Sequence, residues 1–202
     1  MKRKGPLGQY LIVELEKETE NTTIINGKEI WLDTELERAW HARQYGNIIH
    51  PTLNPKPGYK KDNVYPTLKE GEKVYFHHFV MDERFQQRID SVEDKKTYKA
   101  HIDQVYCVIR KGEPVMLQDF IFVEPVIEPE ENYMTSYGLM IKPEPEVLER
   151  EGVVKYVNEF SEDLGVKVGD HIYFESGCNY EIDIEGKKYY RMRNENVLFK
   201  YE

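Results

Sequence analysis

The chain has 202 residues, with 37 acidic and 28 basic side chains and a formal net charge of −9 at pH 7. A chain of this length forms one or two domains. The acidic balance, without clustered Lys and Arg, argues against a nucleic-acid-binding surface, which needs grouped positive charges. No stretch approaches the roughly 18 apolar residues of a membrane span. The basic residues at 2–4 precede no apolar stretch, so no secretory signal is expected. We therefore expect a soluble, cytoplasmic protein without a nucleic-acid or membrane partner.

In chain order, the sequence is dominated by short segments with the apolar–polar alternation or the β-branched and aromatic content of strands. These segments are 9–16, 119–127, 152–157, 171–174, 180–184, 189–193 and 197–201. Glu185 and Gly186 lie in a stretch typical of a hairpin turn. Only residues 33–44 show helix-like spacing of apolar side chains. Many short strands with glycine-bearing turns predict an all-β barrel or sandwich.

The second half of the chain repeats the first half. The aligned segments are 69–76 with 167–174, 96–105 with 188–197, and 11–14 with 121–124. A repeat of roughly a hundred residues is too long for a solenoid unit. We therefore predict two copies of one domain, 1–112 and 113–202. The boundary is expected where Gly112 and Pro114 separate the last strand of one copy from the first strand of the next.

Each copy holds a long segment of poor core-forming character after its first strand, at 17–45 and 128–151. Such composition does not offset the entropy lost on ordering, so we expect long mobile loops. Each loop nevertheless contains three consecutive apolar residues. These triplets are Ile30, Trp31 and Leu32 in the first copy, and Leu139, Met140 and Ile141 in the second. An apolar triplet in a mobile loop indicates docking into a partner's groove. The alternative is an edge strand folded onto its own barrel.

The second copy resembles the GroES-type co-chaperonins. The resemblance rests on the turn at 166–170, the strand after it, a hairpin, and the segment 190–198. It also rests on Leu139, which follows Gly138, and on the later strand that begins at Gly152. The first copy matches more loosely, through 11–14, 30–32, 46–48, 69–76 and 98–105. The resemblance implies two tandem GroES-like β-barrels.

The family resemblance also implies a function. Such barrels assemble into a ring that caps the open end of a GroEL-type chaperonin cylinder, and they assist ATP-dependent folding without catalysis. The docking role would fall on Leu139, Met140 and Ile141, and by the looser match on Ile30, Trp31 and Leu32. Trp31 is larger than the small aliphatic residue usual at the middle of this triplet. The alternative function is that of a GroES-fold structural or assembly protein, such as a phage-encoded one, which has lost chaperonin binding.

The family's barrels also carry a hairpin that arches over the chamber of the ring. At that place the first copy has a proline-containing insertion at 50–67, whereas the second copy has only 158–165. We therefore expect the two copies to contribute unequally to the roof, and the ring to be partly open.

The sequence contains no pattern expected of an enzyme. His77 and His78 adjoin a predicted strand, where neighbouring side chains point to opposite faces and cannot readily share a metal. Cys107 and Cys178 are expected to be free thiols of a reducing compartment. The chain also lacks the Gly-x-Gly-x-x-Gly turn of dinucleotide-binding domains. We therefore expect no catalytic residues, no metal and no cofactor.

Overall fold

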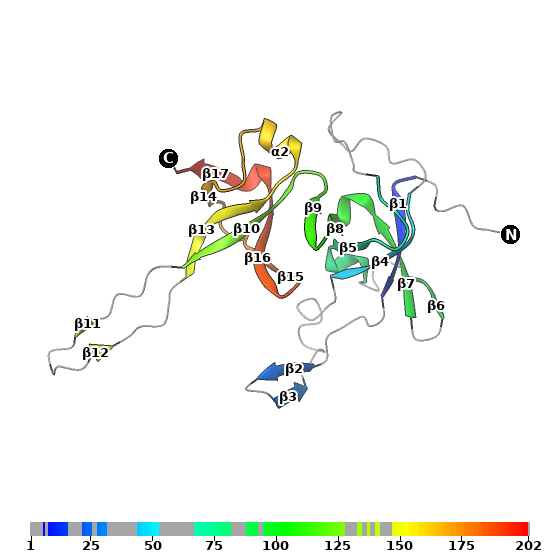
Figure 1. The fold of residues 1–202 in the computed structure, drawn as a ribbon, viewed down its shortest axis with the longest axis horizontal. Coiled ribbons are helices and arrows are strands. Elements are labelled where there is room, and N and C mark those ends of the chain that lie inside the picture. The colour runs from blue at the N-terminus through cyan, green and yellow to red at the C-terminus, as the bar shows by residue number, and fades with distance from the viewer. Residues whose placement is uncertain are drawn as a thin grey trace. The chain divides into compact units, whose positions relative to one another are not determined.

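Figure 1 shows the chain in a computed structural model, which describes residues 6, 8–15, 22–25, 28–31, 44–52, 67–81, 88–92, 95–127, 133–134, 137, 140–141 and 147–201. The chain divides into two compact units, Met1–Gln118 and Asp119–Glu202. The sequence placed this boundary earlier, after residue 112. The difference arises because residues 113–116 pair with the strand before them. Lys111 and Gly112 form the turn of this hairpin, with φ angles of 54° and 82°.

The first unit consists of strands and short 3-10 helices. In chain order they are β1 (Tyr10–Leu15), β2 (Thr22–Ile25), β3 (Lys28–Trp31), β4 (Tyr45–His50), β5 (Lys73–Phe76), η1 (His78–Val80), β6 (Arg88–Val92), β7 (Lys95–His101), η3 (Ile102–Gln104), β8 (Val105–Arg110) and β9 (Glu113–Met116). A seven-stranded antiparallel sheet has the order β6-β7-β1-β4-β5-β8-β9, and β2 and β3 form a separate two-stranded sheet.

The second unit has the same kind of organisation. Its elements are β10 (Phe120–Ile127), β11 (Tyr133–Met134), β12 (Met140–Ile141), β13 (Val147–Tyr156), α2 (Glu159–Asp163), β14 (His171–Phe174), β15 (Tyr180–Ile184), β16 (Lys187–Arg193), η4 (Asn194–Asn196) and β17 (Val197–Lys200). Six strands form an antiparallel sheet in the order β15-β16-β10-β13-β14-β17, and β11 and β12 form a two-stranded sheet.

The two main sheets repeat the same connectivity. Across the sheets, the order β15-β16-β10-β13-β14-β17 corresponds strand for strand to β6-β7-β1-β4-β5-β8. The irregularities in strand pairing also recur at aligned positions: Ile12/Val13 with Phe122/Val123, and Tyr75/Phe76 with Tyr173/Phe174. A bulge bends a strand locally, so shared bulges give the sheets the same bends. The predicted all-β fold with two similar modules is confirmed.

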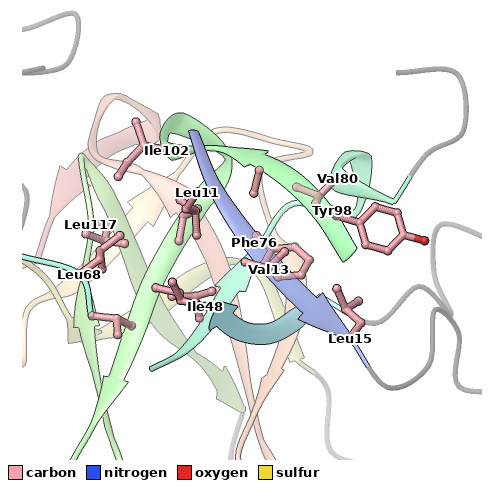
Figure 2. Packing of buried hydrophobic residues seen from close by; sticks show 14 residues of the cluster. Leu11, Val13, Leu15, Ile48, Leu68, Phe76, Val80, Tyr98, Ile102 and Leu117 are labelled. Carbon is pink, nitrogen blue, oxygen red and sulfur yellow. The ribbon is translucent and has the colours of Figure 1, made fainter. Parts of the chain in front are cut away.

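Each sheet encloses a hydrophobic cluster of its own. Alternate residues of a strand face the same side, and along β1 this side carries Leu11, Val13 and Leu15, all buried. The other buried members of the first cluster, drawn with these three in Figure 2, are Ile48, Leu68, Val74, Phe76, Val80, Tyr98, Ala100, Ile102, Val105, Val108 and Leu117. The second cluster contains Ile121, Val123, Val154, Val166, Ile172, Phe174, Tyr190 and Met192. Full burial of a Leu or Val side chain stabilises a fold by about 1.5–3 kcal/mol.

One glycine in each unit permits close strand contact. A Cβ built on Gly46 would lie 2.7 Å from the carbonyl oxygen of Glu14. A Cβ on Gly152 would overlap Val123 Cγ1 and lie 2.9 Å from the carbonyl oxygen of Glu124. The two glycines therefore meet the same requirement, because any side chain there would push the first strand of the sheet away.

The aligned turns before β5 and β14 close in the same way. The backbone N–H of Lys69 donates to Glu72 Oε2 at 2.7 Å, and that of Lys167 donates to Asp170 Oδ2 at 2.8 Å. A cation from the next strand of the sheet, β8 beside β5 and β17 beside β14, then reaches each carboxylate. Arg110 Nε lies 2.8 Å from Glu72 Oε1, and Lys200 Nζ lies 3.1 Å from Asp170 Oδ2. In each unit an ion pair thus connects this turn to the corresponding strand, β8 or β17.

Acid should weaken the first of these ties. Burial raises the pKa of Glu72, but hydrogen bonds from the Arg110 side chain and the Lys69 backbone, together with their charges, outweigh burial and hold the pKa below 4.5. A carboxyl group whose pKa is lowered on folding stabilises the fold above its unfolded pKa. That contribution is lost as the pH falls through the folded pKa. We expect Glu72→Gln to flatten the loss of stability below about pH 4, measured by urea unfolding. Glu70→Gln, at an exposed site in the same turn, should leave the slope unchanged, and equal slopes for Glu72→Gln and wild type would contradict the prediction.

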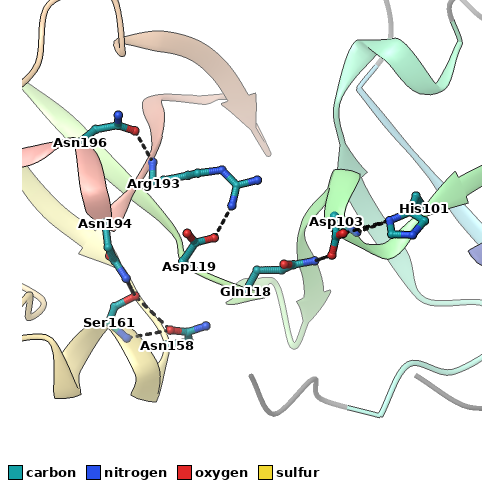
Figure 3. Close-up of polar contacts among 9 residues, drawn as sticks. All are labelled: His101, Asp103, Gln118, Asp119, Asn158, Ser161, Arg193, Asn194 and Asn196. Atoms are coloured by element: carbon teal, nitrogen blue, oxygen red, sulfur yellow. Dashed lines mark hydrogen bonds and ion pairs between the residues drawn. The ribbon is translucent and has the colours of Figure 1, made fainter. Parts of the chain in front are cut away.

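The 3-10 turns η3 and η4 also correspond. The backbone N–H of His101 donates to Gln104 Oε1, and that of Arg193 donates to Asn196 Oδ1, both at 3.1 Å. Figure 3 shows the second of these bonds and the contact of Arg193 with Asp119. These bonds stabilise the turn that connects β7 to β8 in the first unit and β16 to β17 in the second. The repeat therefore includes side-chain hydrogen bonds.

The strands predicted in the second copy are present in the structure. The predicted segments at 171–174 and 180–184 coincide with β14 and β15, whereas β13 begins at Val147, earlier than its predicted start at 152. Glu185 and Gly186 form the predicted hairpin turn, with φ angles of 53° and 82°. Residues 33–44, predicted to have helical spacing, lie outside the described residues except for Gln44.

Candidate functional site

Both candidate triplets lie in a hairpin inserted at the same point of the sheet. β2 and β3 follow β1 and precede β4, and β11 and β12 follow β10 and precede β13. The flanking strands pair directly in both units, β1 with β4 and β10 with β13. The insertion therefore leaves and re-enters the sheet between two neighbouring strands.

The described residues of each triplet lie on the returning strand of the hairpin. In the second unit, Ile141 pairs with Tyr133, and Met140 pairs with Met134. Strands β3 and β12 belong to these two-stranded sheets and not to the main sheets. Their backbone pairing is thus satisfied inside the insertion.

The first unit has the same arrangement, since Trp31 pairs with Thr22 and Ile30 with Thr23. Leu32 and Leu139, the remaining predicted docking residues, lie outside the described residues. The structure therefore brings two residues of each triplet together on one strand.

Sequence reasoning missed one aromatic residue of the second insertion. Tyr137 lies in the turn between β11 and β12, and its side chain is 91% exposed. At the base of the insertion, Ile127 pairs with Val147 and is 57% exposed. The position of Tyr137 in the sequence, two residues before the triplet, was the signal that could have identified it as a candidate. Exposed apolar side chains at the tip and base extend the apolar character of this insertion beyond the triplet.

A short helix occupies the place in the second unit where the family resemblance implies a roof hairpin. In α2, Asn158 Oδ1 accepts hydrogen bonds from the backbone N–H and the hydroxyl of Ser161, both at 3.0 Å. Asn194 Nδ2 donates to the Ser161 hydroxyl oxygen at 2.8 Å, as Figure 3 shows. Ser161 is fully buried, so this network fixes α2 against η4. The aligned insertion of the first unit lies mostly outside the described residues, which include only 50–52 and 67 of it.

The histidine pair is arranged differently from the prediction. His77 and His78 do not lie in a strand. His77 caps η1, where its Nδ1 accepts a hydrogen bond from the backbone N–H of Phe79 at 3.2 Å. The two imidazole rings lie side by side, with centroids 4.2 Å apart. In the described part of the chain, no three His, Cys, Asp or Glu side chains gather as a metal site would require.

Both cysteines are free thiols. Burial raises the pKa of Cys107 well above its usual range. Partial burial and the neighbouring Glu175 carboxylate raise the pKa of Cys178. A raised pKa disfavours the thiolate, which is the nucleophilic form, so neither cysteine is an activated nucleophile. Within the described ranges, no helix is long and apolar enough to cross a membrane.

The fold and these insertions define an all-β protein whose candidate site is a pair of loop hairpins. Residues 114–201 match the family of the chaperonin 10 Kd subunit, the GroES-type co-chaperonins. The match begins in β9, spans the second unit and includes its triplet. A comparison with curated proteins gave no match. The second unit thus has a GroES-like fold.

Proposed function

We propose that this protein is a co-chaperonin that caps a chaperonin ring and assists ATP-dependent protein folding, with no catalysis of its own. The observation that carries the proposal is the match of residues 114–201 to the chaperonin 10 Kd subunit family. In this function Leu139, Met140 and Ile141 dock into an apolar groove of the chaperonin. Each contact is weak, and several loops that dock together from a self-associated ring supply the affinity.

The first unit is proposed as a second module of the same kind. Its support is the repeated strand order, the shared bulges, and the glycine that each unit places against its first strand. Its insertion lies at the same point of the sheet and carries Ile30, Trp31 and Leu32. One chain therefore supplies two candidate docking loops.

The direct test is capture of a purified chaperonin by this protein, with and without ATP. We expect binding that depends on nucleotide, together with inhibition of the chaperonin ATPase. A control variant is Val168→Glu, because Val168 is exposed and the aligned position of the first unit already holds glutamate, Glu70. Wild type and Val168→Glu should bind equally. No capture in either nucleotide state would refute the co-chaperonin function.

A second candidate function is a GroES-fold structural or assembly protein that no longer binds chaperonin. The family match leaves residues 1–113 uncovered, and Trp31 replaces the small aliphatic residue expected at its place. These two observations favour the alternative. The same capture experiment separates the two functions, because an assembly protein would self-associate without retaining chaperonin.

The first-unit loop should contribute less to docking than the second-unit loop. We expect Leu32→Asp to weaken chaperonin capture by a smaller factor than Ile141→Asp, because the bulky Trp31 already limits the fit of that triplet. The measurement is a titration of the chaperonin ATPase with each variant, over the same range of variant concentration. An equal or larger loss with Leu32→Asp would show instead that the first loop is the main docking element.

A further inference from the structure

The second insertion exposes an aromatic ring at its tip. Tyr137 lies between Met134 and Met140, which pair across β11 and β12, and it stands two residues before the triplet. At 91%, it is the most exposed of the large apolar side chains that the structure describes. A single exposed apolar residue needs no explanation, but this ring adjoins three further apolar residues. Exposed apolar side chains that are grouped in this way indicate a surface that a partner covers.

The segment around Tyr137 carries no charged side chain. Residues 133–141, from the start of β11 to the end of β12, contain no Asp, Glu, Lys or Arg, although Glu131 and Lys142 lie just outside them. Moving a charged side chain out of water costs far more free energy than moving a neutral one. The whole hairpin, and not only its triplet, can therefore enter an apolar groove without burying an unpaired charge.

The first insertion differs at the same place. Lys28 lies two residues before its triplet, as Tyr137 does in the second insertion, and Lys28 is exposed. Glu29 adds a second charge directly before that triplet. Lys28 pairs with Ile25 across the hairpin, so these charged residues belong to the hairpin itself. The two insertions therefore present different surfaces in front of their triplets, a charged one in the first unit and an aromatic one in the second.

We propose that Tyr137 is a docking residue that sets the specificity of the second insertion, and that its ring enters an apolar pocket which the partner chaperonin presents beside the groove for the triplet. Aromatic side chains are frequent anchors of interfaces, because they bury a large area and immobilise few rotatable bonds. The tyrosine hydroxyl needs a polar group or water at the rim of such a pocket. The surface that receives Tyr137 is therefore uncharged and large enough for a phenol ring.

This inference rests on the proposed function and deepens it, because it names a chemical feature of the partner. It also separates the two insertions. The first would dock through its triplet alone, whereas the second would dock through its triplet and its tip. A chaperonin whose groove lacks the additional pocket would bind the second insertion more weakly.

The experiment is a titration of the ATPase of a purified GroEL-type chaperonin with full-length wild type, Tyr137→Ala and Tyr137→Phe. We expect Tyr137→Ala to raise the half-inhibiting concentration by about tenfold or more, as truncation of an aromatic anchor does. Tyr137→Phe keeps the ring, so its half-inhibiting concentration should lie closer to that of wild type than to that of Tyr137→Ala. Both variants should keep the wild-type circular dichroism spectrum and urea-unfolding midpoint, because Tyr137 is exposed.

Lys28→Ala is the matched control, because it truncates the exposed residue at the same place of the first insertion. It should leave the half-inhibiting concentration unchanged. Photo-cross-linking provides a second measurement, with a photoreactive phenylalanine derivative in place of Tyr137 or of Val168, which is exposed outside the insertion. With ATP present, we expect the derivative to cross-link to the chaperonin from position 137 and not from position 168.

Equal inhibition by wild type and Tyr137→Ala would overturn this inference and leave the proposed function standing, as would the absence of a cross-link from position 137 to a chaperonin that wild type inhibits. Inhibition by Tyr137→Phe as weak as that by Tyr137→Ala would overturn the apolar pocket, because the hydroxyl would then carry the contact. An equal loss with Lys28→Ala would overturn the assignment of specificity to the second insertion. Failure of wild type to bind the chaperonin at all would overturn both this inference and the proposed function.

Discussion

Ile141→Asp is expected to abolish capture of the chaperonin and inhibition of its ATPase. The change would place a carboxylate in an apolar groove, at a cost of several kcal/mol per site. In the proposed ring the docking contacts would act together, so the loss would be multiplied over all subunits. The barrel should stay folded, because the insertion contributes no described residue to the buried cluster of the second unit. Ile121 and Val123 of this cluster precede the insertion, and its other buried members, from Val154 on, follow it.

The measurement combines an ATPase titration with circular dichroism of the variant. Val168→Glu is again the control, since it adds the same charge to the same unit outside the insertion. Native-like spectra with lost inhibition would support docking by the triplet. Full activity of Ile141→Asp would remove the docking assignment, and with it the main functional role proposed for this loop.

Gly152→Ala is expected to destabilise the protein by about 1–3 kcal/mol, the usual cost of overpacking. The new methyl group would overlap Val123 Cγ1 and approach the carbonyl oxygen of Glu124. Both contacts belong to β10, which pairs with β13 at this point. The strands must separate locally, and the pairing at the centre of the sheet is weakened.

A double-mutant cycle tests the cause. Val123→Ala removes the overlapping methyl group, and by itself should destabilise the fold through a cavity. The combined variant should lose less stability than the sum of the two single changes, because the cavity accepts the added methyl group. Urea unfolding of the four proteins measures this coupling. Strict additivity would show that the Val123 contact does not explain the requirement for glycine.

Local sequence pattern was sufficient to predict β1 and most strands of the second unit. In β1 the alternation of Leu11, Val13 and Leu15 with polar neighbours encodes which face is buried, because strand geometry turns successive side chains to opposite faces. The internal repeat predicted two modules, because segments of similar sequence form similar local structures. The candidate loops were also found from sequence, because an apolar triplet in a charged stretch contrasts with its surroundings.

Pairing between strands could not be predicted in the same way. The prediction assigned residues 113–116 to the second copy, and the family match also begins at 114, whereas in the structure these residues pair with β8. Their sequence specifies an extended segment, but the choice of neighbour depends on which sheet edge is open. His77 and His78 adjoin β5 as predicted, but their orientation differs from that of strand residues, because the strand ends before His77 and His77 caps a turn there.

The sequence by itself therefore determined the all-β class, the two modules and the position of the two candidate loops, since these follow from local periodicity and from the repeat. Only the tertiary structure decided the pairing within each insertion and the need for Gly152. Each of these depends on contacts between segments far apart in the chain. Phe199 and Cys107 occupy aligned positions, yet one is exposed and the other buried, because burial depends on the neighbouring strands that the fold supplies.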